Sequence, residues 1–343
     1  MKVLLDATAI PADLGGVGRY VDDLVPELIA SGVNLAMAVQ QRDVAHFSAK
    51  VPRAHLFPVS QSMESRGARM AWEQTGLPAL IHRIRPDVLH SPLKQKFFTS
   101  AIRRAVRRAD ALVVPSQATR DETIKYAGGD PERFHVAYHG VDTSVFHPVD
   151  DAERARVAAS LGLEGRRYIG FLGTLEPRKN VPNLVRAWID VFRDCEDAPA
   201  LVLAGGPGWD EDIEPALAQV PRHLNVLRPG YLPLEDLPGF LSGCEILAYP
   251  SIGEGFGLPV LEAMACGAAV LTTRELSLPE VGGDAVAYCG SDVQAIARGL
   301  VVLDAQPERR RALGVAALER AAEFTWRASA QAHVEAYRAV LAH

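Results

Sequence analysis

Residues 245–273 read EILAYPSIGEGFGLPVLEAMACGAAVLTT, and this stretch decides the fold. The apolar run at 246–250 predicts a buried strand, and the glycines that follow allow a backbone to approach a ligand closely. Pro259 then stands where a first-turn proline opens a helix, which we expect at 259–266. A helix that begins after such a turn offers unpaired N–H donors and partial positive charge, so the stretch predicts a phosphate cradle.

Two carboxylates flank the glycine-rich turn. Glu254 lies in the turn itself, and Glu262 is expected on the first turn of the helix, facing the same ligand. An ionised carboxylate only accepts hydrogen bonds, so the pair fits the hydroxyls of a ribose or a hexose better than a phosphate. Taken alone, Glu262 is also an ordinary glutamate favoured by the helix dipole.

Short apolar runs alternate with helical segments along the whole chain, which predicts an α/β protein with parallel sheets. In the second half we expect strands at 168–172, 200–204, 225–228, 246–250, 269–272 and 285–289, with helices at 181–192, 211–219, 235–242 and 259–266. In the first half we expect strands at 2–6, 34–39, 87–90 and 111–115, helices at 17–31, 71–84 and 96–109, and a polar stretch at 40–70. The pattern breaks at 140–164, which predicts a linker.

Length and composition bound the class of protein. At roughly 100–200 residues per domain, 343 residues predict two domains. With 48% hydrophobic and 23% charged residues and a mean hydropathy of +0.03, the chain is neither disordered nor fibrous. No apolar run approaches the roughly 18–20 residues of a membrane span, so we expect a cytoplasmic protein. Four cysteines without CxxC spacing are expected to be reduced thiols.

The two halves of the chain differ in charge. Residues 1–150 carry 18 basic and 16 acidic side chains, and the remainder carries 18 and 26. A mildly basic half beside an acidic half favours a small anionic ligand or a membrane surface over nucleic acid, which would need a strongly basic stripe.

With these motifs in view, the sequence resembles the retaining glycosyltransferases of family GT4, which have the GT-B fold. The stretch EGFGLPVLE at 254–262 is similar to the family's E-x7-E motif. Similar motifs occur in the family's order along nearly the whole chain: GGVGRY at 15–20, VPS at 114–116 with Thr119, HGVD at 139–142, GTLEPRKN at 173–180 and LAGG at 203–206. The GTLEPRKN form resembles bacterial mannosyltransferases.

The resemblance implies a GT-B architecture: two Rossmann-like, doubly wound domains that face a deep interdomain cleft. Residues 1–148 would form the acceptor-side domain and residues 149–324 the nucleotide-sugar-binding domain. A C-terminal helix at 325–343 would cross back and pack on the first domain.

The resemblance also implies a division of labour among the site residues. Arg178 and Lys179 would pair with the diphosphate of the donor, Glu262 would take the ribose hydroxyls, and Glu254 with the backbone of 255–257 would hold the donor sugar. Arg178, Lys179 and Glu254 are expected to be catalytic, without a metal. The complete donor-binding set is Gly16, Gly18, Arg178, Lys179, Tyr231, Leu232, Glu254, Gly255, Phe256, Gly257, Leu258 and Glu262.

Within this set, the loop at 15–18 would close over the phosphates from the first domain, and Tyr231 and Leu232 would lie at the nucleobase. Simpler interpretations stay open. Arg178 and Lys179 could form a solvated turn, and the two glycines at 16 and 18 also suggest dinucleotide binding, a weak signal because a loop separates them from their strand. His139 is expected to be structural.

The sequence departs from the family pattern between Leu89 and Lys94. There the family has a further core strand and a loop with an active-site histidine, whereas here the chain runs almost directly into an arginine-rich helix. Either the protein lacks this element or the sequence as written omits it. The second interpretation is favoured, because loss of a central strand would open the core of the first domain.

The arginine-rich helix at 97–109 carries Arg103, Arg104, Arg107 and Arg108 on one side and apolar residues on the other. A basic amphipathic helix can lie on anionic lipid at the inner face of the cytoplasmic membrane, but a solvated basic face over the sheet is favoured here.

We therefore expect a hexosyltransferase that moves a sugar from a nucleotide-diphosphate donor, with GDP-mannose preferred, to a glycan or lipid-linked acceptor. No cofactor beyond the donor is expected. The alternative is a non-catalytic nucleotide-sugar-binding or assembly subunit, suggested by the missing histidine loop.

Overall fold

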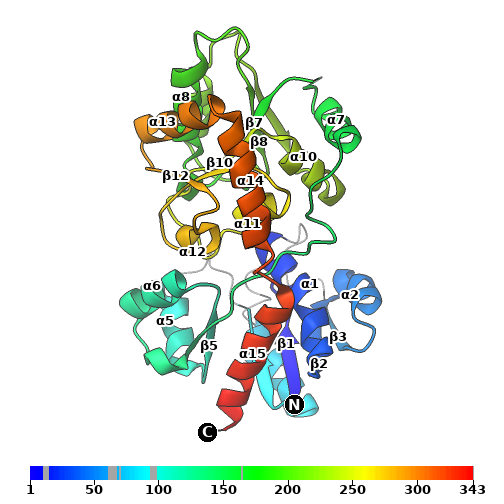
Figure 1. Cartoon of the computed structure of the whole chain (residues 1–343). Helices are drawn as coiled ribbons and strands as arrows, with labels where there is room; N and C mark the ends of the chain where they lie inside the picture. Colours follow the sequence, from blue (N-terminus) through cyan, green and yellow to red (C-terminus); the bar gives the residue numbers. More distant parts are fainter. Residues whose placement is uncertain (11–14, 61–67, 69–70, 93–98, 164, 343) are drawn as a thin grey trace. The chain divides into compact units, whose positions relative to one another are not determined.

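A computed structural model describes the chain except residues 11–14, 61–67, 69–70, 93–98, 164 and 343 (Figure 1). The described residues divide into two compact units. Unit 1 contains Met1–Pro115, Arg120–Gly140 and Trp326–His343, and unit 2 contains Ser116–Thr119 and Val141–Thr325. Apart from the short exchange at Ser116–Thr119, the chain passes from unit 1 to unit 2 after Gly140, whereas the sequence prediction placed the boundary after residue 148. Each unit is described by itself below.

Unit 1 is built on a parallel sheet with strand order β3-β2-β1-β4. These strands are β1 (Lys2–Asp6), β2 (Asn34–Gln40), β3 (His55–Val59) and β4 (Val88–His90). Residues 3–5 and 35–39 are almost fully buried, as expected for strands covered on both faces.

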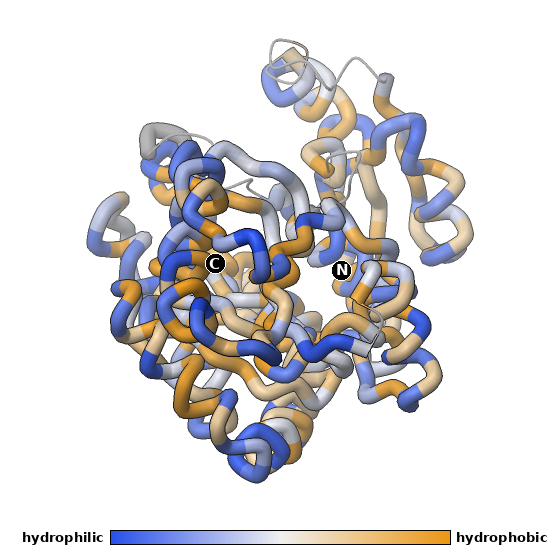
Figure 2. The backbone as a smooth tube through the Cα atoms, turned by 90° about the horizontal axis from the view of Figure 1, so that it is seen from above, coloured by the Kyte–Doolittle hydropathy of each residue, from blue (hydrophilic) through white to orange (hydrophobic). Residues whose placement is uncertain are grey.

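Helices cover the sheet of unit 1. They are α1 (Gly15–Ala30), α2 (Val44–Lys50) and α4 (Leu77–Ile84), the last preceded by a π-helical turn at Trp72–Gly76. Leu77, Leu80 and Ile84 of α4 pack against the sheet. The alternation of hydrophilic and hydrophobic residues along such helices is visible in Figure 2.

Among the described residues, the sheet of unit 1 ends at β4. The next strands, β5 (Leu112–Val114) and β6 (Phe134–Val136), form a separate two-stranded parallel sheet. Helices α5 (Thr99–Arg108) and α6 (Gln117–Ala127) accompany this small sheet, and Val106 of α5 is buried against Val114 and Phe134. The interruption lies where the family pattern has a further strand. Residues 93 and 94, on which the question of the missing segment turns, lie outside the described residues.

The C-terminal helix α15 (Trp326–Leu341) belongs to unit 1, where it packs on α1 and also contacts β5 and β6 (Figure 1). Its anchor is a cluster of aromatic and histidine side chains. The hydroxyl of Tyr20 in α1 lies 2.7 Å from Nε2 of His333 and 3.3 Å from Nε2 of His90. The hydroxyl of Tyr337 lies 2.7 Å from Nδ1 of His90.

A second part of this cluster joins the segment after β6 to α15: His139 stacks on Trp326 at 5.6 Å between ring centroids. His139 thus packs within unit 1, consistent with a structural role. We call Tyr20, His90, His139, Trp326, His333 and Tyr337 the α15 cluster.

Unit 2 contains one parallel six-stranded sheet with order β9-β8-β7-β10-β11-β12. The strands are β7 (Tyr168–Leu172), β8 (Ala200–Ala204), β9 (Val226–Gly230), β10 (Ile246–Tyr249), β11 (Val270–Thr273) and β12 (Ala287–Cys289). Counted from β7, this is the order 3-2-1-4-5-6 of a doubly wound nucleotide-binding sheet. The predicted α/β fold with parallel sheets is confirmed.

The helices of unit 2 form two packed groups (Figure 1). One contains α8 (Val181–Phe192), α9 (Ile213–Leu217) and α13 (Val293–Asp304), and the other contains α7 (Asp151–Ser160), α10 (Leu237–Gly243), α11 (Leu258–Ala265), α12 (Leu278–Gly282) and α14 (Pro307–Ala321). Every residue of β7, β8, β10 and β11 is buried, so both faces of the sheet are covered.

Three sequence predictions about local structure are wrong. The polar stretch at 40–70 holds α2 and β3, and the linker at 140–164 holds α7, whose Asp150 caps the helix by accepting from the backbone N–H of Glu153 at 2.9 Å. The predicted loop at 15–18 is instead the first turn of α1, in which Gly16 is exposed and Gly18 is buried.

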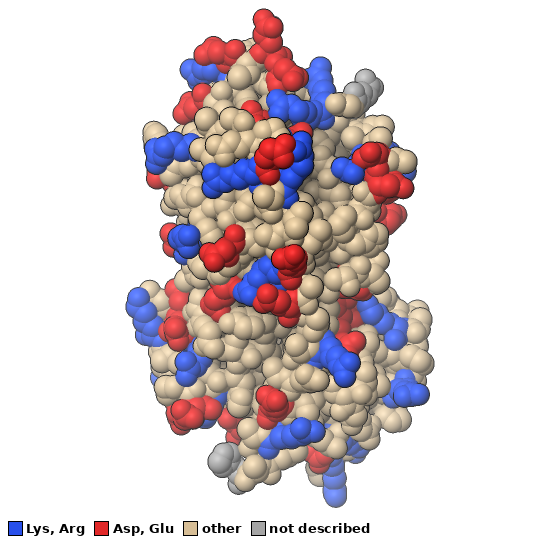
Figure 3. Space-filling model, in the orientation of Figure 1, with Lys and Arg blue, Asp and Glu red and all other residues tan. Residues whose placement is uncertain are grey.

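The surface carries no dominant charge on the face shown in Figure 3, where basic and acidic side chains are interspersed. The four arginines of α5 are all exposed. Within the described ranges, no helix has both the length and the apolar character to cross a membrane.

Candidate functional site

The candidate site lies in unit 2 at the switch point of the sheet, where β7 and β10 are neighbours but their following helices cross over in opposite directions. The loop after β7 contains Arg178 and Lys179, and the loop after β10 contains Glu254. Backbone contacts lock the two loops together, because the carbonyl of Arg178 accepts from the N–H of Ile252 at 2.8 Å and from the hydroxyl of Ser251 at 2.9 Å.

A short helical turn, Pro177–Lys179, presents the two cations. It ends at Asn180, which adopts a left-handed conformation with φ 60° and begins α8. The Asn180 side chain donates to the carbonyls of Pro250 and Ser291, at 3.2 and 2.8 Å. The asparagine therefore fastens the cation-bearing turn to β10.

The carboxylate of Glu254 is the centre of the site. Its Oε1 accepts from Lys179 Nζ at 2.6 Å, from the Ser251 hydroxyl at 2.8 Å and from the Tyr249 hydroxyl at 3.0 Å. Its Oε2 lies 2.6 Å from Nη1 of Arg178. Lys179 also donates to the Tyr249 hydroxyl. Lys179 and Glu254 are only 5% and 7% exposed, so this is a desolvated ion cluster.

The environment shifts the ionisation of these groups. Burial lowers the pKa of Lys179, although the carboxylate of Glu254 acts in the opposite direction. Burial alone would raise the pKa of Glu254, but the charges of Lys179 and Arg178 outweigh it and hold that pKa below its ordinary value. Burial, followed by the charge of Glu254, raises the pKa of Tyr249. The site thus keeps fixed charges in a poorly hydrated setting.

The glycine-rich loop between β10 and α11 is held from several sides. The carbonyl of Gly255 accepts from the hydroxyls of Ser116 and Thr119, at 2.7 and 2.9 Å. Gly257 precedes α11 with φ 105°, a conformation that a side chain would strain. The hydroxyl of Ser277 donates to the carbonyls of Glu254 and Phe256. The loop backbone is therefore preorganised.

The side chains of this loop and of the helix that follows it differ in burial and position. Phe256 is 4% exposed and packs edge-to-face on Phe324, which makes it a core residue of unit 2. Leu258 is half-buried. Glu262 is buried and lies in the second turn of α11, whereas the sequence predicted it in the first turn. Its charge contributes to the raised pKa of Tyr249.

The loops after β8 and β9 complete this edge of the sheet. Gly205 has φ +132°, and a Cβ there would lie 2.1 Å from the carbonyl oxygen of Gly173. Gly208 has φ +63°, and a Cβ there would lie 1.9 Å from the carbonyl oxygen of Leu175. Tyr231, predicted at the nucleobase, is 60% exposed, and its hydroxyl lies against Gly206. Leu232 is half-buried.

The structure thus brings Arg178, Lys179 and Glu254 into direct contact, with Gly255 and Gly257 in the same loop. Gly16 and Gly18 belong to unit 1. Three further residues join this cluster: Tyr249 and Ser251, and Glu176, whose carboxylate accepts from Nε of Arg178 at 2.9 Å. They were not predicted, because a strand tyrosine, a loop serine and a loop glutamate look like ordinary structural residues.

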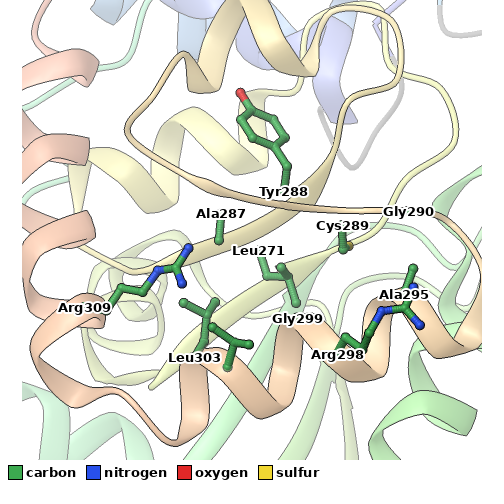
Figure 4. A pocket seen from close by; sticks show the side chains of 11 residues that line it. Leu271, Ala287, Tyr288, Cys289, Gly290, Ala295, Arg298, Gly299, Leu303 and Arg309 are labelled. Atoms are coloured by element: carbon green, nitrogen blue, oxygen red, sulfur yellow. The ribbon is translucent and has the colours of Figure 1, made fainter.

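A pocket of about 370 Å³ lies apart from this cluster, at the edge strand β12. Leu271 and Leu303 form part of its apolar floor, with Arg298 and Arg309 on either side (Figure 4). None of the predicted site residues lines it. Among the residues that the structure describes, no group of three or more His, Cys, Asp or Glu side chains is arranged to hold a metal ion.

Two family models match the chain. The model for glycosyl transferases group 1 matches residues 153–320, and the model for glycosyltransferase family 4 matches residues 91–145. The first match covers the candidate site.

Similar curated proteins include the alpha-maltose-1-phosphate synthase of Mycolicibacterium smegmatis, 33% identical over 258 residues, and the O-antigen chain mannosyltransferase B of Escherichia coli, 30% identical over 251 residues. These alignments cover 70% and 73% of this chain. They cover 66% of each relative, so the chain spans slightly less than two thirds of their length.

Among solved structures, the Anabaena protein HepE in complex with UDP and glucose has the same fold, with a TM-score of 0.79 at 17% identity, covering 99% of this chain and all of that one. The family models, the relatives and the fold agree with one another. The chain belongs to the GT4-like glycosyltransferases with the GT-B fold.

Proposed function

We propose that the chain is a retaining hexosyltransferase that uses a nucleotide-diphosphate sugar as donor and a glycan or lipid-linked saccharide as acceptor. The observation that carries this proposal is the buried ion pair of Lys179 and Glu254, with the half-exposed Arg178 beside it, at the switch point of a doubly wound sheet. Breaking the anomeric C–O bond places negative charge on the leaving diphosphate. Cations fixed before the reaction stabilise that charge without reorganisation.

In this proposal Arg178 and Lys179 bind the diphosphate, and Glu254 with the backbone of 255–257 holds the donor sugar. Glu262 accepts from the ribose hydroxyls, and Tyr231 with Leu232 lies at the nucleobase. Phe256 and Leu258 shape the loop, Phe256 from within the core. Gly16 and Gly18 of unit 1, in the first turn of α1, would contribute backbone N–H groups in this proposal.

Retention follows in this proposal from attack on the same face of the sugar that the leaving group departs from. The acceptor hydroxyl loses its proton to an oxygen of the departing phosphate as the new C–O bond forms. Arg178 and Lys179 neutralise the charge that remains on the nucleoside diphosphate. In this proposal Arg178 and Lys179 are the charged side chains at the diphosphate, and no cofactor takes part.

For the donor we propose GDP-mannose, supported by the similarity to the O-antigen chain mannosyltransferase B. HepE was solved with UDP and glucose, so UDP-glucose is the competing donor. A thermal-shift panel of GDP-, UDP-, ADP- and dTDP-sugars separates them, because a ligand that binds only the folded state raises its stability. A larger shift with UDP-glucose than with GDP-mannose would exclude the proposed donor.

The first prediction concerns the donor site. Lys179→Ala and Glu262→Ala should each weaken binding of the matching nucleoside diphosphate by ~10-fold or more, because each removes a buried charged partner. Isothermal titration calorimetry measures this, with the exposed Lys125→Ala as control. Unchanged affinity in both variants would refute the site assignment.

A second candidate function is non-catalytic binding of the nucleotide sugar, which the interrupted sheet of unit 1 favours. Transfer to acceptor, or slow hydrolysis of the donor, by the purified chain distinguishes an enzyme from a binding subunit. Binding of donor with neither reaction would favour this second function.

We further propose that the exposed arginines of α5 form a solvated basic face, since the apolar side of α5 is already packed on β5 and β6. The alternative is contact of these arginines with anionic lipid at the cytoplasmic face of the membrane. Co-sedimentation with vesicles that contain anionic lipid, compared with neutral vesicles, decides between the two.

A further inference from the structure

Arg178 is held by more acceptors than a mobile phosphate-binding arginine would have. Its Nε donates to Oε2 of Glu176 at 2.9 Å, and its Nη1 donates to the carbonyl of Gly253 at 2.9 Å and contacts Glu254 at 2.6 Å. No acceptor among the described residues contacts Nη2. The Arg178 side chain is 44% exposed, whereas those of Glu176 and Glu254 are 9% and 8% exposed. The buried carboxylates therefore fix one side of the guanidinium and leave its remaining donors toward solvent.

The carboxylate of Glu254 has few hydrogen-bond acceptor positions left for Arg178. Its Oε1 already accepts from Lys179, Ser251 and Tyr249, so only Oε2 has room for another donor. A sugar hydroxyl bound to Glu254 would compete for Oε2 with Arg178. Once a donor is bound, Arg178 keeps the carbonyl of Gly253 and the carboxylate of Glu176 as acceptors, and of these two Glu176 carries the charge.

Glu176 is itself rigidly placed. Its backbone N–H donates to the carbonyl of Thr174, and its carbonyl accepts from the N–H of Lys179, both at 2.8 Å. Pro177 follows directly and fixes one backbone angle of the turn between Glu176 and Arg178. The residue is 7% exposed, and a buried carboxylate of this kind is retained only with a charged or hydrogen-bonding partner.

We propose that Glu176 is a positioning residue that orients the guanidinium of Arg178 toward the diphosphate of the donor. This inference rests on the proposed function, because it requires a diphosphate at the switch point. It assigns Glu176 no contact with the substrate. Charge-assisted hydrogen bonds of the Arg–carboxylate type are the strong ones in proteins, so loss of one should misplace the arginine measurably.

The test compares nucleoside diphosphates with monophosphates. In Glu176→Ala we expect the affinity for GDP or UDP, whichever binds wild type more tightly, to fall by ~10-fold, while the affinity for the matching monophosphate stays within about twofold. In turnover assays kcat should fall more than KM rises, because the misplaced cation is needed most when charge develops on the diphosphate. A general structural defect would weaken both nucleotides alike.

Two further variants keep the test valid if Glu176→Ala does not fold. Glu176→Gln retains an oxygen that accepts from Nε, so it should stay within about threefold of wild type. Glu176→Asp keeps the charge but is shorter by one methylene, so it should again weaken only the diphosphate. Glu214→Ala is the matched control, since Glu214 pairs with Arg228 on the surface of unit 2.

The outcomes separate the two hypotheses. If wild type does not prefer the diphosphate to the monophosphate, the proposed function fails and the role of Glu176 fails with it. If wild type has that preference and Glu176→Ala and Glu176→Asp keep it unchanged, only the role of Glu176 is refuted.

Discussion

Lys179 is a buried cation beside the carboxylate of Glu254. Burial lowers its pKa, and Glu254 opposes this effect more strongly than Glu176 does. Taking a charge out of water is costly unless it is paired, so the two residues form an interdependent unit. The carboxylate of Glu254 favours the charged form of Lys179, which a diphosphate would need, against the effect of burial.

A prediction at the residue scale follows from this dependence. In Glu254→Gln the pKa of Lys179 should fall further, so affinity for the nucleoside diphosphate should begin to decline at a lower pH than in wild type. Nucleoside diphosphate lacks the sugar, so the assay does not test the sugar contact of Glu254. Calorimetric titrations at pH 7, 8 and 9 measure the profile, with Glu319→Gln on the exposed side of α14 as control. Superimposed profiles would show that Glu254 does not sustain the charge of Lys179.

At the scale of elements, the loops after β7 and β8 are packed backbone to backbone. Gly208 lies so close to Leu175 that a Cβ would be 1.9 Å from its carbonyl oxygen. This contact supports the loop that carries Glu176, Arg178 and Lys179. A small change in one loop is therefore transmitted directly to the other.

Gly208→Ala should accordingly destabilise unit 2 by about 2 kcal/mol or more, since it adds a steric overlap to a strained φ. Gly162→Ala is a matched control: Gly162 has a similar φ of +72° but open space around it, so it should cost only about 1 kcal/mol. Urea unfolding of both variants measures the difference. Equal losses of stability would show that the loops adapt to the extra atom.

Much of the fold could be predicted from the sequence, and the failures have physical causes. Continuous apolar runs located β1, β7, β8 and β10 well, because a strand buried on both faces needs such a run. The strand β3 was missed because its sequence, HLFPV, contains a proline and is only partly buried. The helix α7 was missed because its acidic first turn resembles a linker.

The candidate site was predictable to a similar extent. The proximity of Arg178, Lys179 and Glu254 follows from strand order, since the carboxyl ends of neighbouring parallel strands meet at one edge of the sheet. The contacts of Glu176 and Tyr249 depend on how each loop turns after its strand. Such contacts cannot be predicted from the local sequence, because they join residues up to 70 positions apart.

At the scale of the whole molecule, unit 1 depends on a network of neutral side chains. Nδ1 of His333 faces the carbonyl of Ser329 at 2.7 Å, so its Nε2 can accept from Tyr20. His90 can then donate from Nε2 to Tyr20 while its Nδ1 accepts from Tyr337. In this arrangement both histidines are neutral rings, each donating from one nitrogen and accepting at the other.

This network should make unit 1 sensitive to acid. Burial lowers the pKa of His90 and His139 to about 3 and that of His333 to about 4, with the charge of His333 adding to the effect on the other two. Because each folded-state pKa lies below the unfolded value near 6.5, the unfolded state binds more protons below that pH. Stability is therefore complete above about pH 6.5 and falls as the pH decreases toward 4, by about 2 kcal/mol per histidine between pH 6.5 and 5.

Hydrogen exchange of the α15 amides, corrected for intrinsic rates, measures this loss at pH 7 and pH 5. His333→Gln removes one of the titrating groups and should reduce the pH dependence, whereas His55→Gln on the exposed part of β3 should not. The groups that contact these histidines include Tyr20 from α1 and Trp326 and Tyr337 from α15, and His90 and His333 also face each other. Protection of α15 that does not change with pH would contradict the prediction.

The return of α15 to unit 1 also sets an order of events during synthesis. Tyr20 is hydrogen-bonded to a histidine 313 residues further along the chain. A ribosome must therefore make all of unit 2 before α15 can dock, and the nascent unit 1 spends that time with the surface of α1 that α15 covers still exposed. Unit 1 therefore completes its packing only after unit 2 has been synthesised.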